Sequence, residues 1–145
     1  DAEAATGRTA HELITIASMV ERETGDPLEE RAKIARVIMN RLDADEPTGI
    51  DATILYGLGR RGNEGGLTRT ELQTDGPYNS RTRSGLPPTA IALPSESSLA
   101  AAIRPAVGNW RWYVLQSATP RTHGFFDNYQ DFLAAKDECD AKGLC

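Results

Sequence analysis

The sequence has no long apolar run, and its positive charges are outnumbered. No segment approaches the roughly 18 consecutive apolar residues that a membrane-spanning helix needs. The 145 residues include 16 Lys and Arg against 21 Asp and Glu, which gives a formal net charge of -5 and a pI near 5.0. Nucleic-acid-binding domains usually present a basic surface. These absences predict a soluble domain without a nucleic-acid partner.

Cysteine and histidine are scarce as well. The chain contains only Cys139, Cys145, His11 and His123, with no CxxC spacing, so we expect no metal site. The two cysteines bound the tail CDAKGLC, which suits either a disulfide in an extracytoplasmic protein or two reduced surface thiols. The first residues lack the pattern of a signal peptide, and an export or anchoring sequence is expected to lie outside this chain.

Several motifs of well-known enzyme classes are also missing. The sequence contains no GxSxG, no Walker A loop and no GxGxxG loop after a strand, which argues against serine hydrolases and nucleotide-binding enzymes. The two histidines are far apart and indicate no catalytic triad. We therefore expect His123 to have a structural or surface role rather than a catalytic one.

Local signals at the start of the chain predict an amphipathic helix over residues 10–24. Thr9 and Glu12 form a capping box, and apolar residues follow at helical spacing. Gly25 is expected to close this helix in the left-handed conformation. The predicted helix therefore ends one turn after its apolar stripe, with two glutamates near its end.

The next segments predict a second helix and a long loop. Asp26 is expected to cap a helix over residues 27–43, with Pro27 at its first position. Residues 60–94 are rich in Gly, Pro, Arg and Thr and show little periodicity, so we interpret them as an ordered loop. Loops of this length are uncommon in compact domains unless they form a functional surface.

The C-terminal third predicts the only strands of the chain. Residues 110–126 contain two short β-type runs around the turn SATPR, which predicts a β-hairpin. Residues 128–142 have the pattern of an amphipathic helix. Together these segments predict a mostly helical α+β fold, with residues 1–145 as a single domain.

Glu21 and Glu23 lie at opposite edges of the apolar stripe of the first predicted helix. Glu23 is in the last turn, where the helix dipole and partial burial both disfavour its anion and raise its pKa. A general acid needs such a raised pKa. The alternative is that both are edge carboxylates paired with Arg22 or Arg31.

Residues 77–91, PYNSRTRSGLPPTAI, contain polar side chains in a stretch stiffened by proline. Tyr78 and Asn79 offer a hydroxyl and an amide that a rigid backbone can hold in place at low entropic cost. Such a surface suits a sugar, although an ordinary proline-anchored loop would have the same composition.

Five ordered blocks resemble the endolytic murein transglycosylase family (MltG, or YceG-like). They read IASMVERET, RAKIARVIMNRL, DATILYGLG, LTRTELQTDGPYNSRTRSGLPPTAIALP and THGFF. The resemblance implies a lysozyme-like domain that cleaves peptidoglycan strands between N-acetylmuramic acid and N-acetylglucosamine and leaves a 1,6-anhydro end, without metal or cofactor. It also implies an isolated catalytic domain of a membrane-anchored, extracytoplasmic parent protein, with the cell-wall synthesis machinery as a possible partner.

The resemblance also implies roles for individual residues. The family's catalytic acid precedes the threonine in the first helix and falls on Glu23. Glu21 is expected nearby, either in a supporting role among the substrate-binding residues or in a structural one. The expected substrate-binding residues are Tyr78, Asn79, Asp51, Thr53, Tyr56 and Arg81. The sequence departs from the family pattern at Gly49, at residues 93–95 and around Gln130.

Two rival functions remain open from the sequence. A hydrolytic muramidase on the same scaffold would use Asp51 as its second carboxylate, because ordinary glycosidases need two. A non-catalytic wall-binding module would need only the sugar-binding loop. The nature of the product separates the first rival from the family activity, and the absence of any turnover would indicate the second.

Overall fold

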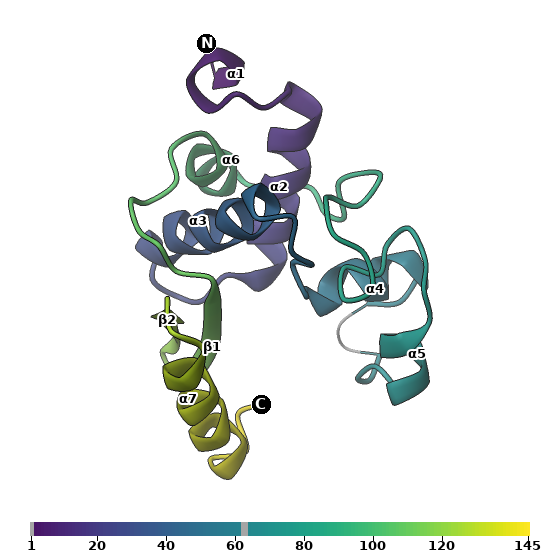
Figure 1. The fold of residues 1–145 in the computed structure, drawn as a ribbon, viewed down its shortest axis with the longest axis vertical. Coiled ribbons are helices and arrows are strands. Elements are labelled where there is room, and N and C mark those ends of the chain that lie inside the picture. The colour runs from purple at the N-terminus through teal and green to yellow at the C-terminus, as the bar shows by residue number, and fades with distance from the viewer. Residues whose placement is uncertain (1, 62–63) are drawn as a thin grey trace.

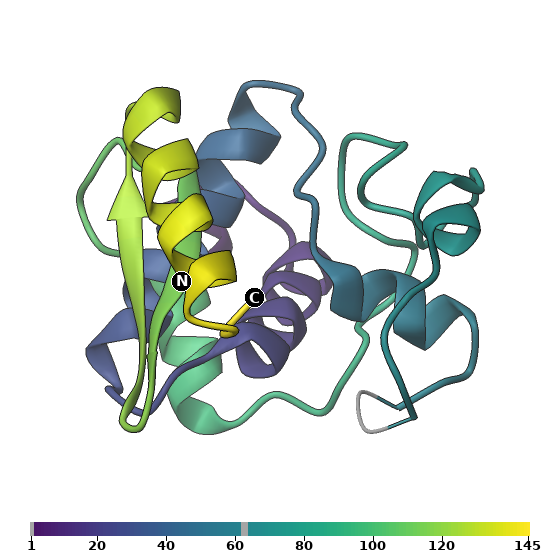
Figure 2. The ribbon, with the colours of Figure 1, turned by 90° about the horizontal axis from the view of Figure 1, so that it is seen from below.

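The computed structural model describes residues 2–61 and 64–145. In these ranges the chain forms seven helices and one two-stranded antiparallel sheet, which confirms the mostly helical α+β class. A short helix, α1 (Ala2–Thr6), precedes the main body. Figures 1 and 2 show the other elements as a central helical body with one arm on each side. Within the described residues, no helix has the length and apolarity needed to cross a bilayer.

Three helices form the central body: α2 (Ala10–Glu23), α3 (Glu29–Asp43) and α6 (Glu96–Ile103). Ile16 and Met19 of α2 and Ile34 and Ile38 of α3 are at most 1% exposed. Burying such a side chain contributes about 1.5–3 kcal/mol. The predicted capping box of Thr9 with its partner glutamate is present at the start of α2. The end of α2 is therefore fixed by a well-packed body.

The start of α3 differs from the prediction. The helix begins at Glu29, two residues later than expected, and Leu28 occupies the cap position without a side-chain hydrogen bond. Asp26 does not cap the helix because its carboxylate accepts the backbone N–H of Arg121 in the second strand. The residues between α2 and α3 are thus attached to a distant segment of the chain.

Gly25 also acts differently from the prediction. Its φ is not among the positive values, and α2 ends because Thr24 has an extended backbone (φ -63, ψ 145). A Cβ atom at Gly25 would collide with the carbonyl of Arg121 and lie 2.6 Å from Oε2 of Glu30. Glycine is needed here for a close approach between two parts of the chain.

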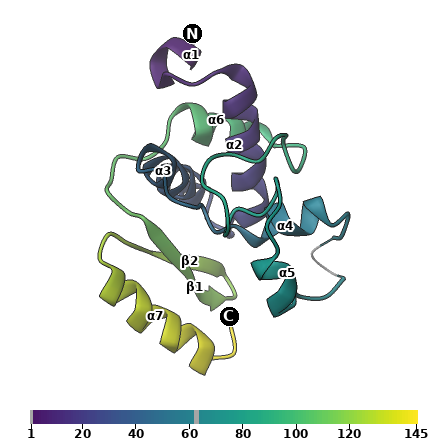
Figure 3. The ribbon, with the colours of Figure 1, turned by 45° about the vertical axis from the view of Figure 1, so that its right-hand side comes forward.

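One arm contains α4 (Asp51–Gly57), α5 (Arg69–Gln73) and the coil that follows. The prediction of an unbroken loop over residues 60–94 is wrong at α5. Thr68 and Glu71 form a capping box around the first turn of this helix, a signal that the sequence carries and that the loop prediction overlooked. Figure 3 shows this arm beside the C-terminal end of α2.

The other arm contains the hairpin, β1 (Trp112–Ala118) and β2 (Arg121–Phe126), covered by α7 (Tyr129–Ala141). The strands pair in antiparallel register, with an irregularity on β1 between Leu115 and Ser117. These elements match the predicted hairpin over residues 110–126 and the helix over residues 128–142. Cys139 and Cys145 form a disulfide that closes the tail after α7.

Candidate active site

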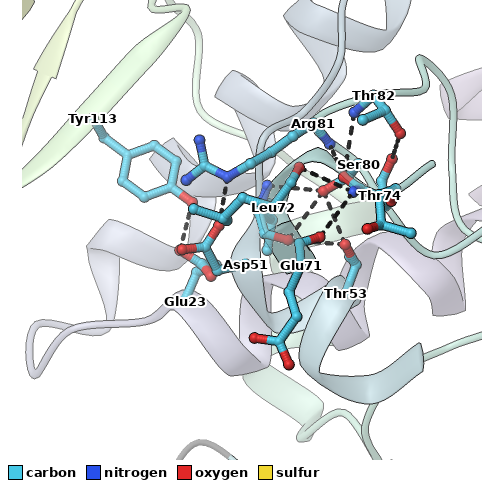
Figure 4. Close-up of polar contacts among 12 residues, drawn as sticks. Glu23, Asp51, Thr53, Glu71, Leu72, Thr74, Ser80, Arg81, Thr82 and Tyr113 are labelled. Carbon is cyan, nitrogen blue, oxygen red and sulfur yellow. Dashed lines mark hydrogen bonds and ion pairs between the residues drawn. The ribbon is translucent and has the colours of Figure 1, made fainter. Parts of the chain in front are cut away.

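The two arms meet the helical body at Glu23, the last residue of α2. The hydroxyl of Tyr113 on β1 donates a hydrogen bond of 2.8 Å to Oε2 of Glu23. Figure 4 shows Tyr113 approaching Glu23 from the hairpin, while Asp51 lies beside it from the opposite arm. Glu23 is partly buried. A carboxyl group therefore stands at the junction of three separate elements.

The surroundings of Glu23 favour its protonated form. Burial raises the pKa of Glu23 above its ordinary value, and the charge of Asp51 adds to this effect. The hydrogen bond from Tyr113 and the charges of His123 and Arg121 act in the opposite direction, with the net shift upward. Burial also raises the pKa of Tyr113 well above its ordinary value, so its phenol stays neutral and remains a donor. A raised carboxyl pKa is what a general acid requires.

Asp51 and Arg81 form an ion pair on the α4 side of Glu23. Nε of Arg81 donates to Oδ1 of Asp51 over 2.6 Å, and the two side chains are 46% and 48% exposed. The side chain of Arg81 is therefore about half exposed at the edge of the site, where a dissolved ligand can reach it.

Thr53 and Asn79 lie beneath this surface and not on it. Thr53 is fully buried, with Oγ1 2.8 Å from the carbonyl of Ile50 and 2.9 Å from Oγ of Ser80. Asn79 is 4% exposed. Both side chains are almost fully buried and form hydrogen bonds within the arm, so their main role is to hold the arm together.

The Asn79 side chain organises its own loop. Its Nδ2 donates to the carbonyls of Leu72 (3.1 Å) and Thr74 (2.7 Å), and its Oδ1 accepts the backbone N–H groups of Arg81 (2.9 Å) and Thr82 (3.2 Å). These bonds connect α5 with the segment that carries Arg81. Asn79 thereby positions Arg81 next to Asp51.

Tyr56 and Tyr78 form an aromatic pair further along the same arm. Their ring centroids are 5.3 Å apart, and Tyr56 is 45% exposed. The hydroxyl of Tyr78 lies 2.9 Å from Oγ1 of Thr89, and a Cβ atom at Gly57 would lie 2.6 Å from Cβ of Tyr78. Tyr78 also lines a hollow of about 200 Å³ formed by residues 77–80 and 83–88, which does not include Glu23.

Glu21 forms hydrogen bonds to the start of α6, in an environment different from that of Glu23. Its Oε2 accepts hydrogen bonds from the Ser95 hydroxyl (2.6 Å), the Ser95 N–H (3.1 Å) and the Ser98 hydroxyl (2.5 Å). These bonds lower the pKa of Glu21 and fasten α2 to the start of α6. The two glutamates that the sequence places at opposite edges of one helix thus have pKa values shifted in opposite directions.

Tyr113 was not predicted from the sequence as a site residue. It lies in a run of aromatic residues with the ordinary pattern of a strand, and no local signal connects it with Glu23, which is 90 residues away. Glu30, which pairs with His123 next to the site, was not predicted either. The side chains of Glu30 and His123 are 8% and 5% exposed, and Oε2 lies 2.8 Å from Nδ1.

The chain is similar to proteins that are named endolytic murein transglycosylases. The one from Bacillus subtilis (strain 168) is 34% identical over 109 residues, which make up 75% of this chain and 29% of the relative. The one from Streptococcus pneumoniae serotype 2 (strain D39) is 32% identical over 126 residues, or 85% of this chain and 22% of the relative. The chain thus spans less than a third of the length of either relative.

The fold has a counterpart among solved structures. A crystal structure of a YceG-like protein from Listeria monocytogenes superposes with a TM-score of 0.80 and 28% sequence identity, covering 90% of this chain and 41% of the other. The YceG-like family itself matches residues 1–138 of this chain. The chain therefore belongs to the YceG-like family.

Proposed function

We propose that this chain is an endolytic lytic transglycosylase that cleaves peptidoglycan strands between N-acetylmuramic acid and N-acetylglucosamine. One observation carries the proposal: a partly buried carboxyl group with a raised pKa, Glu23, accepts a hydrogen bond from the neutral phenol of Tyr113 at the junction of the two arms. The names of two longer relatives support it.

In the proposed reaction Glu23 acts first as an acid and then as a base. Its carboxyl proton passes to the oxygen that links the two sugars, and the bond from C1 of the muramic acid to that oxygen breaks. The carboxylate then takes the proton of the C6 hydroxyl as O6 bonds to C1, which leaves a 1,6-anhydro end. No water is consumed, and Glu23 ends the cycle protonated. The Tyr113 hydroxyl stabilises the carboxylate that exists between the two steps.

The remaining site residues divide into contact and support roles in this proposal. The exposed ring of Tyr56, backed by the half-buried ring of Tyr78, offers aromatic surface against which a sugar ring can pack. Arg81 can meet carboxylates of the lactyl group or the stem peptide. The buried Asn79 and Thr53 support the arm, and Glu21 supports the contact between α2 and α6.

The proposed substrate places the site of action outside the cytoplasmic membrane. The disulfide between Cys139 and Cys145 agrees with this location, because such bonds persist in oxidising compartments. We further propose that this chain forms one catalytic domain of a longer parent protein.

The position of Asp51 favours a second candidate function, that of a hydrolytic muramidase. Asp51 lies beside Glu23 (Figure 4), and its charge contributes to the raised pKa of Glu23. A hydrolytic muramidase would use this carboxylate to activate water or to form a covalent intermediate. The ion pair between Asp51 and Arg81 weighs against that role, because Oδ1 of the carboxylate already accepts a hydrogen bond from Nε of Arg81.

Digestion of purified glycan strands tests the proposal. The unmodified protein should release fragments with anhydro ends, whereas Glu23→Gln should release none and still bind the strands in a pull-down. Glu21→Gln serves as the matched control, since it changes a glutamate of the same helix and should retain cleavage. Fragments with reducing ends would support the muramidase, and strand binding without cleavage by the unmodified protein would indicate a binding module.

A further inference from the structure

We infer that the buried pair of Glu30 and His123 is a positioning element that holds the Tyr113 hydroxyl on Glu23. The inference rests on the proposed function, in which Glu23 transfers the proton. It assigns a role in catalysis to two residues that do not contact the substrate. It also means that the hairpin contributes to the function of the site.

The pair is held by two hydrogen bonds. Oε1 of Glu30 accepts the backbone N–H of His123 over 2.8 Å, and Oε2 lies 2.8 Å from Nδ1 of the same residue. An ionised carboxylate has acceptors only, so Nδ1 is the ring nitrogen that carries the hydrogen. Both side chains are less than a tenth exposed. Glu30 in the first turn of α3 thereby fixes both the backbone and the ring of His123.

The His123 ring in turn supports Tyr113. The two rings pack edge to face, with centroids 5.6 Å apart and an interplanar angle of 86°. His123 is the cross-strand partner of Leu115, two residues along β1 from Tyr113, so His123 and Tyr113 are diagonal neighbours on the same face of the hairpin. A shift of His123 would therefore move the Tyr113 ring and the hydroxyl that reaches Glu23.

The segment after Glu23 is attached to the same strand. The N–H of Asp26 donates to the carbonyl of Arg121 over 2.8 Å, and the Asp26 carboxylate accepts the N–H of Arg121. Gly25 has no room for a side chain because Glu30 and Arg121 lie directly against it. The end of α2, the start of α3 and the strand β2 are thus locked together around the Glu23–Tyr113 contact.

The charged groups around this contact come from several elements. The pKa of Glu23 is affected by the charges of Asp51 in α4 and of Arg121 and His123 in β2. The pKa of Tyr113 is affected by the charge of Arg41 in α3. Only His123 among these also packs against the Tyr113 ring. Because a buried acid–base pair adds little net stability compared with apolar packing, we assign this pair a positioning role.

A double-mutant cycle tests the inference. Glu30→Gln and His123→Asn are each made with Tyr113 intact and in a Tyr113→Phe background, where the ring remains and the hydroxyl is absent. With Tyr113 intact, each change should lower kcat on the order of tenfold, change KM little and shift the pH profile. In the Phe background the loss of kcat should nearly vanish for both changes, because the hydroxyl they position is gone. His123→Asn should keep only the shift of the pH profile that comes from removing its direct effect on the pKa of Glu23.

Glu12→Gln serves as the control, because it alters another hydrogen-bonded carboxylate, at the opposite end of α2 from Glu23. Its effect on kcat should be small and the same in both backgrounds. Equal losses from Glu30→Gln in both backgrounds, or loss of folding in both Glu30→Gln and His123→Asn, would overturn the positioning role and leave a structural one. Absence of cleavage by the unmodified protein would instead contradict the proposed function itself.

Discussion

The hydroxyl of Tyr113 lies 2.8 Å from Oε2 of Glu23, although the two residues are 90 positions apart in the sequence. The contact joins the end of a helix in the body to a strand in one arm. It gives a partly buried carboxyl group one neutral donor, which stabilises the anion without neutralising it. The reactivity of Glu23 therefore depends on how the hairpin is placed as well as on the helix.

Tyr113→Phe should change the pH dependence of cleavage. The hydrogen bond from Tyr113 favours the ionised form of Glu23, so loss of this bond raises the pKa of Glu23 further. Because Glu23 must be protonated to start the reaction, the limb of the pH–rate profile on which it loses its proton should move to higher pH. The maximal rate should fall on the order of tenfold, since the carboxylate formed during the reaction is less stabilised.

The control for this prediction is Tyr129→Phe. Tyr129 is 50% exposed and makes no hydrogen bond through its hydroxyl within the described part of the chain. Its loss should leave the profile unchanged. A Tyr113→Phe profile that coincides with that of the unmodified protein would show that the hydroxyl has no influence on Glu23.

Glu23→Gln should stabilise the fold, and more so at pH 8 than at pH 4. The pKa of Glu23 is raised in the folded protein, so in the pH range between the unfolded and folded pKa values the folded state binds more protons. The free energy of unfolding therefore falls as pH rises through this range. Glutamine removes that dependence, and the melting temperature at pH 8 should increase by about 2–5 °C, the effect of about 1 kcal/mol in a domain of this size. An equal change at both pH values would contradict the burial of Glu23.

Glu21→Gln should have the opposite effect. Hydrogen bonds from Ser95 and Ser98 lower the pKa of Glu21, so its ionised form stabilises the fold at pH values above the unfolded pKa. That stability is lost as pH falls through the lowered pKa. At pH 7 the substitution should cost about 1–3 kcal/mol in urea denaturation, with a smaller difference at pH 3. Unchanged stability at pH 7 would mean that these bonds do not hold α2 against α6.

Gly57→Ala should weaken substrate binding and leave the chemical step nearly intact. The new Cβ would lie 2.6 Å from Cβ of Tyr78 and displace that ring from Tyr56. We expect KM to rise roughly 10-fold, equivalent to about 1.4 kcal/mol, with kcat within a factor of about two. Gly76→Ala is the matched control, since a Cβ there has open space. Equal KM values for the two variants would remove the tyrosine pair from the binding surface.

Local signals in the sequence predicted the elements that depend on neighbouring residues. The capping box of Thr9 and the periodicity that follows it place α2, and with it Glu23, within one residue. The same kind of signal was present at Thr68 but was outweighed by the surrounding glycine and proline. Residues within one helical turn are thus sufficient to predict where a helix begins.

Features that depend on distant segments could not be predicted in this way. Nothing near Gly25 or Asp26 indicates that β2 will pack against them, so their expected turn and cap roles were wrong. Asn79 has the donors and acceptor that a sugar needs, but the same groups satisfy backbone carbonyls and N–H groups, and only the folded loop decides between these uses.

The most direct test of the account is the mass of the fragments released in water enriched in the heavy oxygen isotope. If Glu23 alone serves as acid and then base, the new ends should be anhydro sugars, one water lighter than a reducing end, with no label from the solvent. New reducing ends, one water heavier than anhydro ends before any label is counted, would show that water attacks C1, and they would contradict the central claim.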